Sequence, residues 1–181
     1  MVTFISSFVF AGVLSAYVFL GRGLTRVANA ESLESRARLT LYYFTQDVSS
    51  ASTIIAQNPG TGVTGTQFTL NVPGLGSVVY ATDWSLGTDQ GMLTRQVGSN
   101  PALTLLTNVT SISFAFSDPT GTPVMVPSSA PPSPQIDIQQ AYMTFTSTAG
   151  YAQSGARSQL TVVSPGVTLK NKSFLKDPDD P

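Results

Sequence analysis

The chain has 181 residues, only 10% of them charged, and its nine basic and ten acidic side chains leave a net charge of −1. It contains neither histidine nor cysteine, which excludes histidine acid–base catalysis, thiol nucleophiles, disulfides and imidazole or thiolate metal sites. The sequence has no basic run beyond a loose lysine tail, so nucleic-acid binding is not expected.

One uninterrupted helix is predicted from Met1 to about Ser50, because the first proline is Pro59. Residues 1–21 form its hydrophobic half, and the stretch from Val2 to Leu20 carries no charge. About 20 apolar residues are needed to cross the roughly 30 Å hydrocarbon core of a bilayer. The first half is therefore predicted to lie in a membrane or in a bundle of similar helices.

Residues 22–52 form an amphipathic second half of the same helix. Its apolar residues recur in steps of three and four, which places them on one face: Leu24, Val27, Ala30, Leu33, Ala37, Leu41, Phe44, Val48 and Ala51. The charged residues, Asp47 among them, are assigned to positions off this stripe. We expect Leu33, Ala37, Leu41, Phe44 and Val48 to cover the apolar face of a sheet.

The two halves follow one another without a linker, which favours one fused rod over a signal anchor joined to an unrelated domain. The charge distribution conflicts with an exported head, because Arg22 and Arg26 follow the apolar stretch and no basic residue precedes it. The positive-inside rule would keep the downstream side in the cytoplasm. Either the head is cytoplasmic, or residues that precede Met1 are missing from the sequence as given.

Residues 53–170 are predicted to form an antiparallel sheet of about seven or eight short strands, because their apolar residues alternate with period two. The expected strands lie around Phe68–Val72, and at Ser77–Trp84, Met92–Val97, Leu103–Val109, Ile112–Phe116, Ile138–Thr146, Gln159–Val163 and Val167–Leu169. The predicted fold class is therefore α+β, with a long N-terminal helical spine packed on an antiparallel sheet.

Two segments fall outside the strand pattern. The Pro-rich segment 119–134 contains six prolines and is predicted to be a long irregular loop. It is equally consistent with a surface that touches a partner and with a loop that has no role. The tail, residues 171–181, is polar and is expected to fray.

The acidic residues do not form a pattern typical of a catalytic or metal site. Asp118 begins a turn signature, Asp118-Pro119-Thr120-Gly121, and Trp84 beside Asp83 is better explained as a core aromatic than as a ligand pocket. Asp89, Asp137 and the tail acids Asp177, Asp179 and Asp180 lack the spacing of a calcium loop. We expect no cofactor, no metal, no small-molecule substrate and no enzymatic activity.

Several segments of the chain resemble type IV pilin-like proteins. Ala11–Ala16 leads into Leu33–Leu39 and then into Phe44–Ala51, which is similar to the family's helix ending "aromatic-x-x-Asp-(Val/Leu)-x-x-Ala". In the head, Leu93-Thr94-Arg95 resembles the family's "Leu-x-Arg" strand, and Leu106–Phe114 resembles "Leu-x-x-Asn-Val-x-x-Phe-x-Phe". The likeness is greatest to J-type minor pseudopilins of type II secretion and to W-type minor pilins.

The resemblance implies a structural subunit of a type II secretion or type IV pilus-like filament. It implies a single pass through the bacterial inner membrane, a head in the periplasm or on the cell exterior, and other pilin-like subunits as partners. The helix would be buried first in lipid and then among neighbouring helices, with small residues allowing close approach. The assembly residues would be Phe4, Phe8, Phe10, Gly12, Ser15, Ala16, Tyr17 and Phe19.

The sequence departs from the family at its start. The family's leader ends in glycine, is followed by Phe-Thr-Leu-(x)-Glu and is cut by a prepilin peptidase, and none of these residues is present. We expect the missing leader to lie upstream of Met1, where its basic residues would also resolve the orientation conflict. The remaining alternative is a membrane-anchored extracytoplasmic binding module or adhesin that uses the Pro-rich segment.

Overall fold

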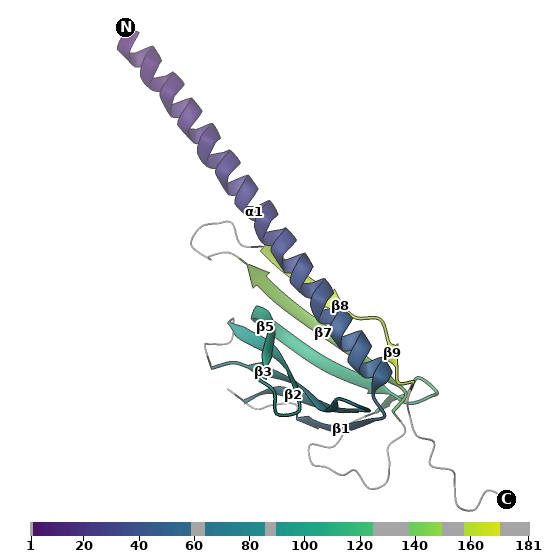
Figure 1. Ribbon diagram of the computed structural model, residues 1–181. Helices are drawn as coiled ribbons and strands as arrows, with labels where there is room; N and C mark the ends of the chain where they lie inside the picture. The colour runs from purple at the N-terminus through teal and green to yellow at the C-terminus, as the bar shows by residue number, and fades with distance from the viewer. Residues whose placement is uncertain (1, 59–63, 86–89, 125–137, 150–157, 171–181) are drawn as a thin grey trace, which may run out of the picture.

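The computed structural model of the chain describes residues 2–58, 64–85, 90–124, 138–149 and 158–170. A single 49-residue helix, α1 (Val2–Ser50), is followed by an antiparallel sheet that lies against its C-terminal half (Figure 1). The strands are β1 (Thr53–Asn58), β2 (Thr64–Val72), β3 (Gly76–Asp83), β4 (Gly91–Val97), β5 (Leu103–Ser117), β6 (Pro123–Val124), β7 (Gln140–Ala149), β8 (Ser158–Val163) and β9 (Val167–Thr168).

The nine strands form one sheet in the order β1-β2-β3-β4-β5-β7-β8, with β6 paired to β5 and β9 paired to β7. Every pairing is antiparallel, and most neighbours in the sheet are also neighbours along the chain. This arrangement confirms the predicted α+β class and the predicted antiparallel sheet. The predicted strand positions agree with the structure to within a few residues, but β1 is not among the predicted strands, and two further differences are informative.

The first difference is β5, which is one 15-residue strand where the sequence predicts two short ones. Leu93 pairs with Leu106 and Gly91 pairs with Val109, so two β5 residues stand opposite one β4 residue. The extra residue forms a β-bulge at Asn108, whose φ is 53°. Asparagine adopts this left-handed conformation more readily than most residues. The strand therefore bends at Asn108 without leaving the sheet.

The second difference is the Pro-rich segment, whose beginning is ordered. Pro123 and Val124 form β6 and pair with Ser117 and Phe116 of β5, and proline is compatible with such a strand at the edge of a sheet. Asp118 closes the hairpin, because its Oδ1 accepts hydrogen bonds from the backbone amides of Thr120 and Thr122, each 2.8 Å long. The predicted turn at Asp118 is confirmed, and residues 125–134 lie outside the described part of the chain.

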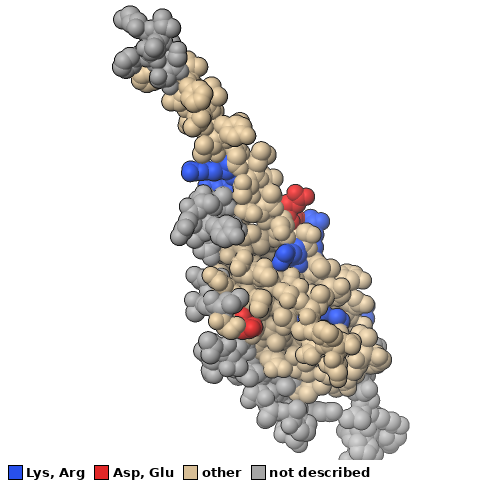
Figure 2. All heavy atoms as spheres, turned by 60° about the vertical axis from the view of Figure 1, so that its left-hand side comes forward, with Lys and Arg blue, Asp and Glu red and all other residues tan. Residues whose placement is uncertain are grey.

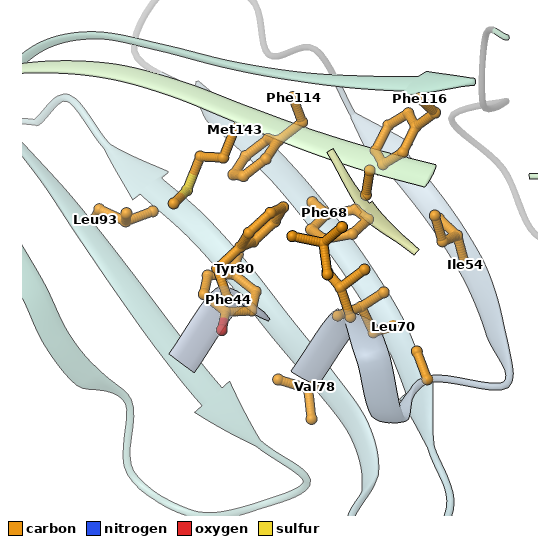
Figure 3. Packing of buried hydrophobic residues seen from close by; sticks show 14 of the residues in the cluster. Phe44, Ile54, Phe68, Leu70, Val78, Tyr80, Leu93, Phe114, Phe116 and Met143 are labelled. Carbon is orange, nitrogen blue, oxygen red and sulfur yellow. The ribbon is translucent and has the colours of Figure 1, made fainter. Parts of the chain in front are cut away.

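The core lies between α1 and one face of the sheet (Figure 3). Phe44 is fully buried, and its ring centroid lies 6.0 Å from that of Tyr80, 6.2 Å from that of Phe68 and 6.4 Å from that of Phe114. These three partners come from β3, β2 and β5. One helical side chain thus joins three strands, and the alternation of each strand turns its large residue toward the helix.

Candidate functional site

The N-terminal half of α1 projects beyond the sheet (Figure 1). Every side chain from Phe8 to Ala28 is exposed, over a helical length of about 30 Å. Four of the predicted assembly aromatics are among the most exposed, namely Phe8 at 77%, Phe10 at 71%, Tyr17 at 79% and Phe19 at 78%. Exposed apolar surface of this extent marks a site of interaction with a membrane or with other proteins. We call residues 8–28 the protruding half.

The small residues of the protruding half also face open space. Gly12, Ser15 and Ala16 are exposed, and a Cβ atom added at Gly12 would meet no other atom within 4 Å. A larger side chain at Gly12 therefore causes no clash within this chain, which makes the position a clean probe of contacts with other molecules. Phe4 belongs to the first turns of α1, whose side chains lie outside the described part of the structure.

The helix also satisfies the physical requirements for a membrane span. Within the described residues, α1 is the single helix whose length and composition suffice to cross a bilayer. Among the residues drawn in colour, Figure 2 shows the outer part of the rod without charged side chains, and basic side chains where the rod meets the head. The protruding half can thus enter a bilayer, with charge at its boundary with the head.

The C-terminal half of α1 packs on the sheet from Leu33 onward. The predicted packing residues Leu33, Ala37, Phe44 and Val48 are buried, and Leu41 is partly buried against the core. We call residues 33–50 the packed half. The first members of the predicted stripe lie elsewhere, since Leu24 is 72% exposed and Val27 is 66% exposed.

The packed half begins later than the amphipathic stretch, which starts at residue 22, and it begins at Leu33, the first of the residues expected to cover the sheet. The sheet reaches back beyond Leu33 to Arg26, but this contact is polar and leaves Leu24 and Val27 exposed. At the start of β8, the Ser158 hydroxyl donates a hydrogen bond to the carbonyl oxygen of Arg26, 3.3 Å away. This polar contact lies near the end of the interface that is closest to the N-terminus of α1. The apolar spacing of the sequence continues beyond it toward the N-terminus.

Asp47 occupies the position where the structure differs most from the sequence prediction. It was assigned to the charged surface, yet its relative exposure is 1%. Arg95 of β4 donates two hydrogen bonds to its carboxylate, from Nε at 2.6 Å and from Nη2 at 2.7 Å. The hydroxyl of Tyr80, on β3, donates a third at 2.6 Å. We call Asp47, Tyr80 and Arg95 the buried carboxylate cluster.

The surroundings of the cluster keep the Tyr80 hydroxyl protonated and the Arg95 guanidinium charged. Burial raises the pKa of Tyr80 far above its usual range, and the neighbouring Asp47 charge raises it further. The hydrogen bonds to Asp47 likewise raise the pKa of Arg95. The Tyr43 ring covers the guanidinium at 4.9 Å, a cation–π contact. The cluster therefore holds a carboxylate against one cation and one neutral hydroxyl donor.

The position of Asp47 on α1 makes the burial of its carboxylate costly in free energy. Asp47 lies in the last turn of α1, where an acidic side chain is unfavourable beside the negative end of the helix dipole. An unpaired carboxylate in this buried position would also lose its hydration without compensation. The three hydrogen bonds from Arg95 and Tyr80 offset both costs, and they do so with groups from two different strands.

Sequence reasoning singled out the segments of Asp47 and Arg95 but not their connection, and it did not single out Tyr80. Phe44-x-x-Asp47 and Leu93-x-Arg95 were noted as separate family-like segments, and the structure joins them through one ion pair. Strand alternation was the available signal, since it places Arg95 on the same face as the buried Leu93. Tyr80 stands directly opposite Arg95 in the register of β3 and β4.

Asp83, another acidic candidate, has a structural explanation. Asp83 is exposed and accepts a hydrogen bond from the backbone amide of Ser85 at 2.8 Å, and this bond lowers its pKa. Trp84 is partly buried against the core, close enough to Gly91 that a Cβ there would lie 2.5 Å from the indole ring. Asp89, Asp137 and the tail acids 177, 179 and 180 lie outside the described part. Among described residues, no group of three potential metal-ligating side chains occurs.

Comparison of the chain with models of protein families, with curated proteins and with solved structures finds no match.

Proposed function

We propose that this protein is a minor structural subunit of a pilin-like filament, of the minor pseudopilin or minor pilin kind. The observation that carries the proposal is a single helix with two environments. Its first half exposes apolar residues on every side, and its second half is built into an antiparallel head. An exposed rod continuous with a folded head suits a subunit that joins others through the rod.

The driving force for assembly is the burial of the protruding half. In water, side chains such as Phe8, Phe10 and Phe19 would be exposed at a cost of about 25 cal/mol for each Å² of apolar surface. A bilayer removes this cost first, and a bundle of neighbouring helices removes it after assembly. Packing between helices then depends on shape, so Gly12 and Ala16 allow the backbones to approach closely.

The proposed location follows from the same arrangement. The uncharged stretch of the helix, residues 2–21, is about as long as the hydrocarbon core is thick, about 30 Å, so the protein would cross the bacterial inner membrane once. The head would lie in the periplasm or on the cell exterior, where other pilin-like subunits assemble. The proposed partners are those subunits and the membrane, without a nucleic acid or a small-molecule substrate.

The test compares substitutions that keep the protruding half apolar but change its shape. Gly12→Leu and Ala16→Phe should leave the protein in the membrane, because neither introduces charge. Both should abolish crosslinks from α1 to helices of other pilin-like subunits, and co-purification with them. Gly12→Ala is the matched control and should retain both, because alanine is nearly as small as glycine.

The outcome separates the filament subunit from the alternative function. If Gly12→Leu and Ala16→Phe insert and crosslink as well as the parent protein, the rod acts only as an anchor. The protein would then be a membrane-anchored binding module or adhesin, and its partner should instead be lost when the Pro-rich segment 119–134 is shortened.

A further inference from the structure

The contact between α1 and the sheet combines two kinds of interaction. Most of it is apolar, with Leu33, Ala37, Phe44 and Val48 packed on the sheet. Apolar burial is non-directional, so it fixes the rotation of the helix about its own axis only through the shapes of its side chains. The buried carboxylate cluster is directional, because its hydrogen bonds weaken steeply when donor and acceptor are misaligned.

The cluster is placed where it can fix the rotation of α1 about its own axis. The helix runs mainly against β2, β5, β7, β8 and β9, whereas Tyr80 and Arg95 come from β3 and β4. The two donors therefore hold Asp47 from a pair of strands that lies between β2 and β5 in the sheet. A helix turned by one residue, about 100°, would carry Asp47 away from both donors and leave buried polar groups unpaired.

We propose that the buried carboxylate cluster sets the rotation of α1 on the sheet, and thereby the direction that each face of the protruding half takes relative to the head. Asp47, Tyr80 and Arg95 are positioning residues in this scheme. Because α1 is continuous, a rotation set at Asp47 is transmitted to Tyr17 and Leu24, many residues away. The consequence for assembly rests on the proposed function, while the rotation itself does not.

If the cluster served only to stabilise the contact between α1 and the sheet, apolar residues could do the same. Replacing a buried ion pair by apolar residues of similar volume is often neutral or stabilising. An all-apolar contact would therefore hold α1 equally well while leaving its rotation less defined. The proposal is therefore testable. Replacing the cluster by apolar residues should change the rotation of α1 without unfolding the head.

The test measures distances between spin labels in the full-length chain in detergent micelles. The chain has no cysteine, so labels can be placed at single introduced cysteines without a background. One label pair joins Leu24→Cys to Ser113→Cys on the sheet, and the other joins Arg22→Cys to Ser113→Cys. Leu24 and Arg22 are two residues apart, about 200° around the helix, so a rotation changes the two distances in opposite directions and a tilt changes them together.

The main variant is Asp47→Leu/Tyr80→Phe/Arg95→Met. In the parent chain both distance distributions should be narrow. In the variant the head should stay folded, and the two distances should spread or shift in opposite directions. The matched control is Glu34→Gln/Arg38→Met, which removes the exposed ion pair of the same helix, whose side chains are 59% and 78% exposed. The control should leave both distributions unchanged.

A folded triple variant with unchanged distances would overturn the proposal and reduce the cluster to a stabilising contact. If the triple variant does not fold, Tyr80→Phe decides, because it removes one donor and keeps the ring packed against Phe44. Broader distributions in Tyr80→Phe support the proposal, and unchanged ones overturn it. No partner subunit takes part, so these results are independent of the crosslinks that test filament assembly.

Discussion

The two halves of α1 contain similar apolar side chains in opposite environments. Phe10 in the protruding half is 71% exposed, and Phe44 in the packed half is fully buried. No proline or break separates them, and the helix is continuous from Val2 to Ser50. The difference comes from what lies beside each half, which is a sheet in one case and open space in the other. Apolar content alone therefore does not identify the core of this protein.

Two matched substitutions should separate the halves most strongly. Phe44→Ala should lower the free energy of unfolding of the head by about 3–5 kcal/mol, because it opens a cavity among three strands. Phe10→Ala should leave it unchanged, since that side chain is 71% exposed. Urea unfolding in micelles, followed by the fluorescence of Trp84, measures both. A similar loss in the two variants would contradict the division of the helix.

The polar contacts of α1 allow a second comparison, between the buried and the exposed ion pair. Arg95→Met should cost about 3 kcal/mol, because it leaves Asp47 buried and without its cation. Arg38→Met should cost less than about 1 kcal/mol, because the Glu34–Arg38 pair lies in solvent. The same urea titration applies, and equal costs would show that Asp47 gains little from its partner.

The pH dependence of unfolding gives a further test of the packed half, because the cluster that holds Asp47 contains the ionisable Tyr80. The pKa of Tyr80 is raised in the folded state, whereas an unfolded tyrosine ionises near pH 10. Its contribution is therefore complete below about pH 10 and is lost as the pH rises further, because the unfolded chain then releases the proton more easily. Thermal unfolding between pH 8 and about 11 should show a decline that is shallower in Tyr80→Phe. Equal slopes would mean that Tyr80 ionises as freely in the folded state.

The smallest effect is expected at the exposed β5–β6 turn, which belongs to neither half of the helix. Hydrogen bonds from the Thr120 hydroxyl and nearby amides lower the pKa of Asp118. They favour the turn above the usual carboxyl pKa and are lost as the pH falls below it. Asp118→Ala should speed hydrogen exchange of the Thr120 and Thr122 amides and leave global unfolding unchanged. A large drop in global stability would show that the turn supports the core.

Local patterns in the sequence determined much of this structure. The absence of proline before Pro59 predicted the continuous helix, the three- and four-residue steps placed Phe44 and Val48 on its packed face, and the turn at Asp118 was evident from its neighbours. These features depend on residues that are close in sequence, so periodicity and turn chemistry suffice to predict them. The protruding half was predictable for the same reason, as a run of apolar residues too uniform for an amphipathic surface helix.

Only the tertiary structure decided that Leu24 and Val27 stay exposed and what surrounds Asp47. The apolar spacing continues through Leu24 and Val27, and the contact with the sheet, made by strands far along the chain, leaves both exposed. The carboxylate of Asp47 is buried because Tyr80 and Arg95 reach it from strands 33 and 48 residues away. A charged residue is assigned to the surface by default, since burial costs free energy unless partners offset it. Those partners come together only when β3, β4 and the helix are assembled.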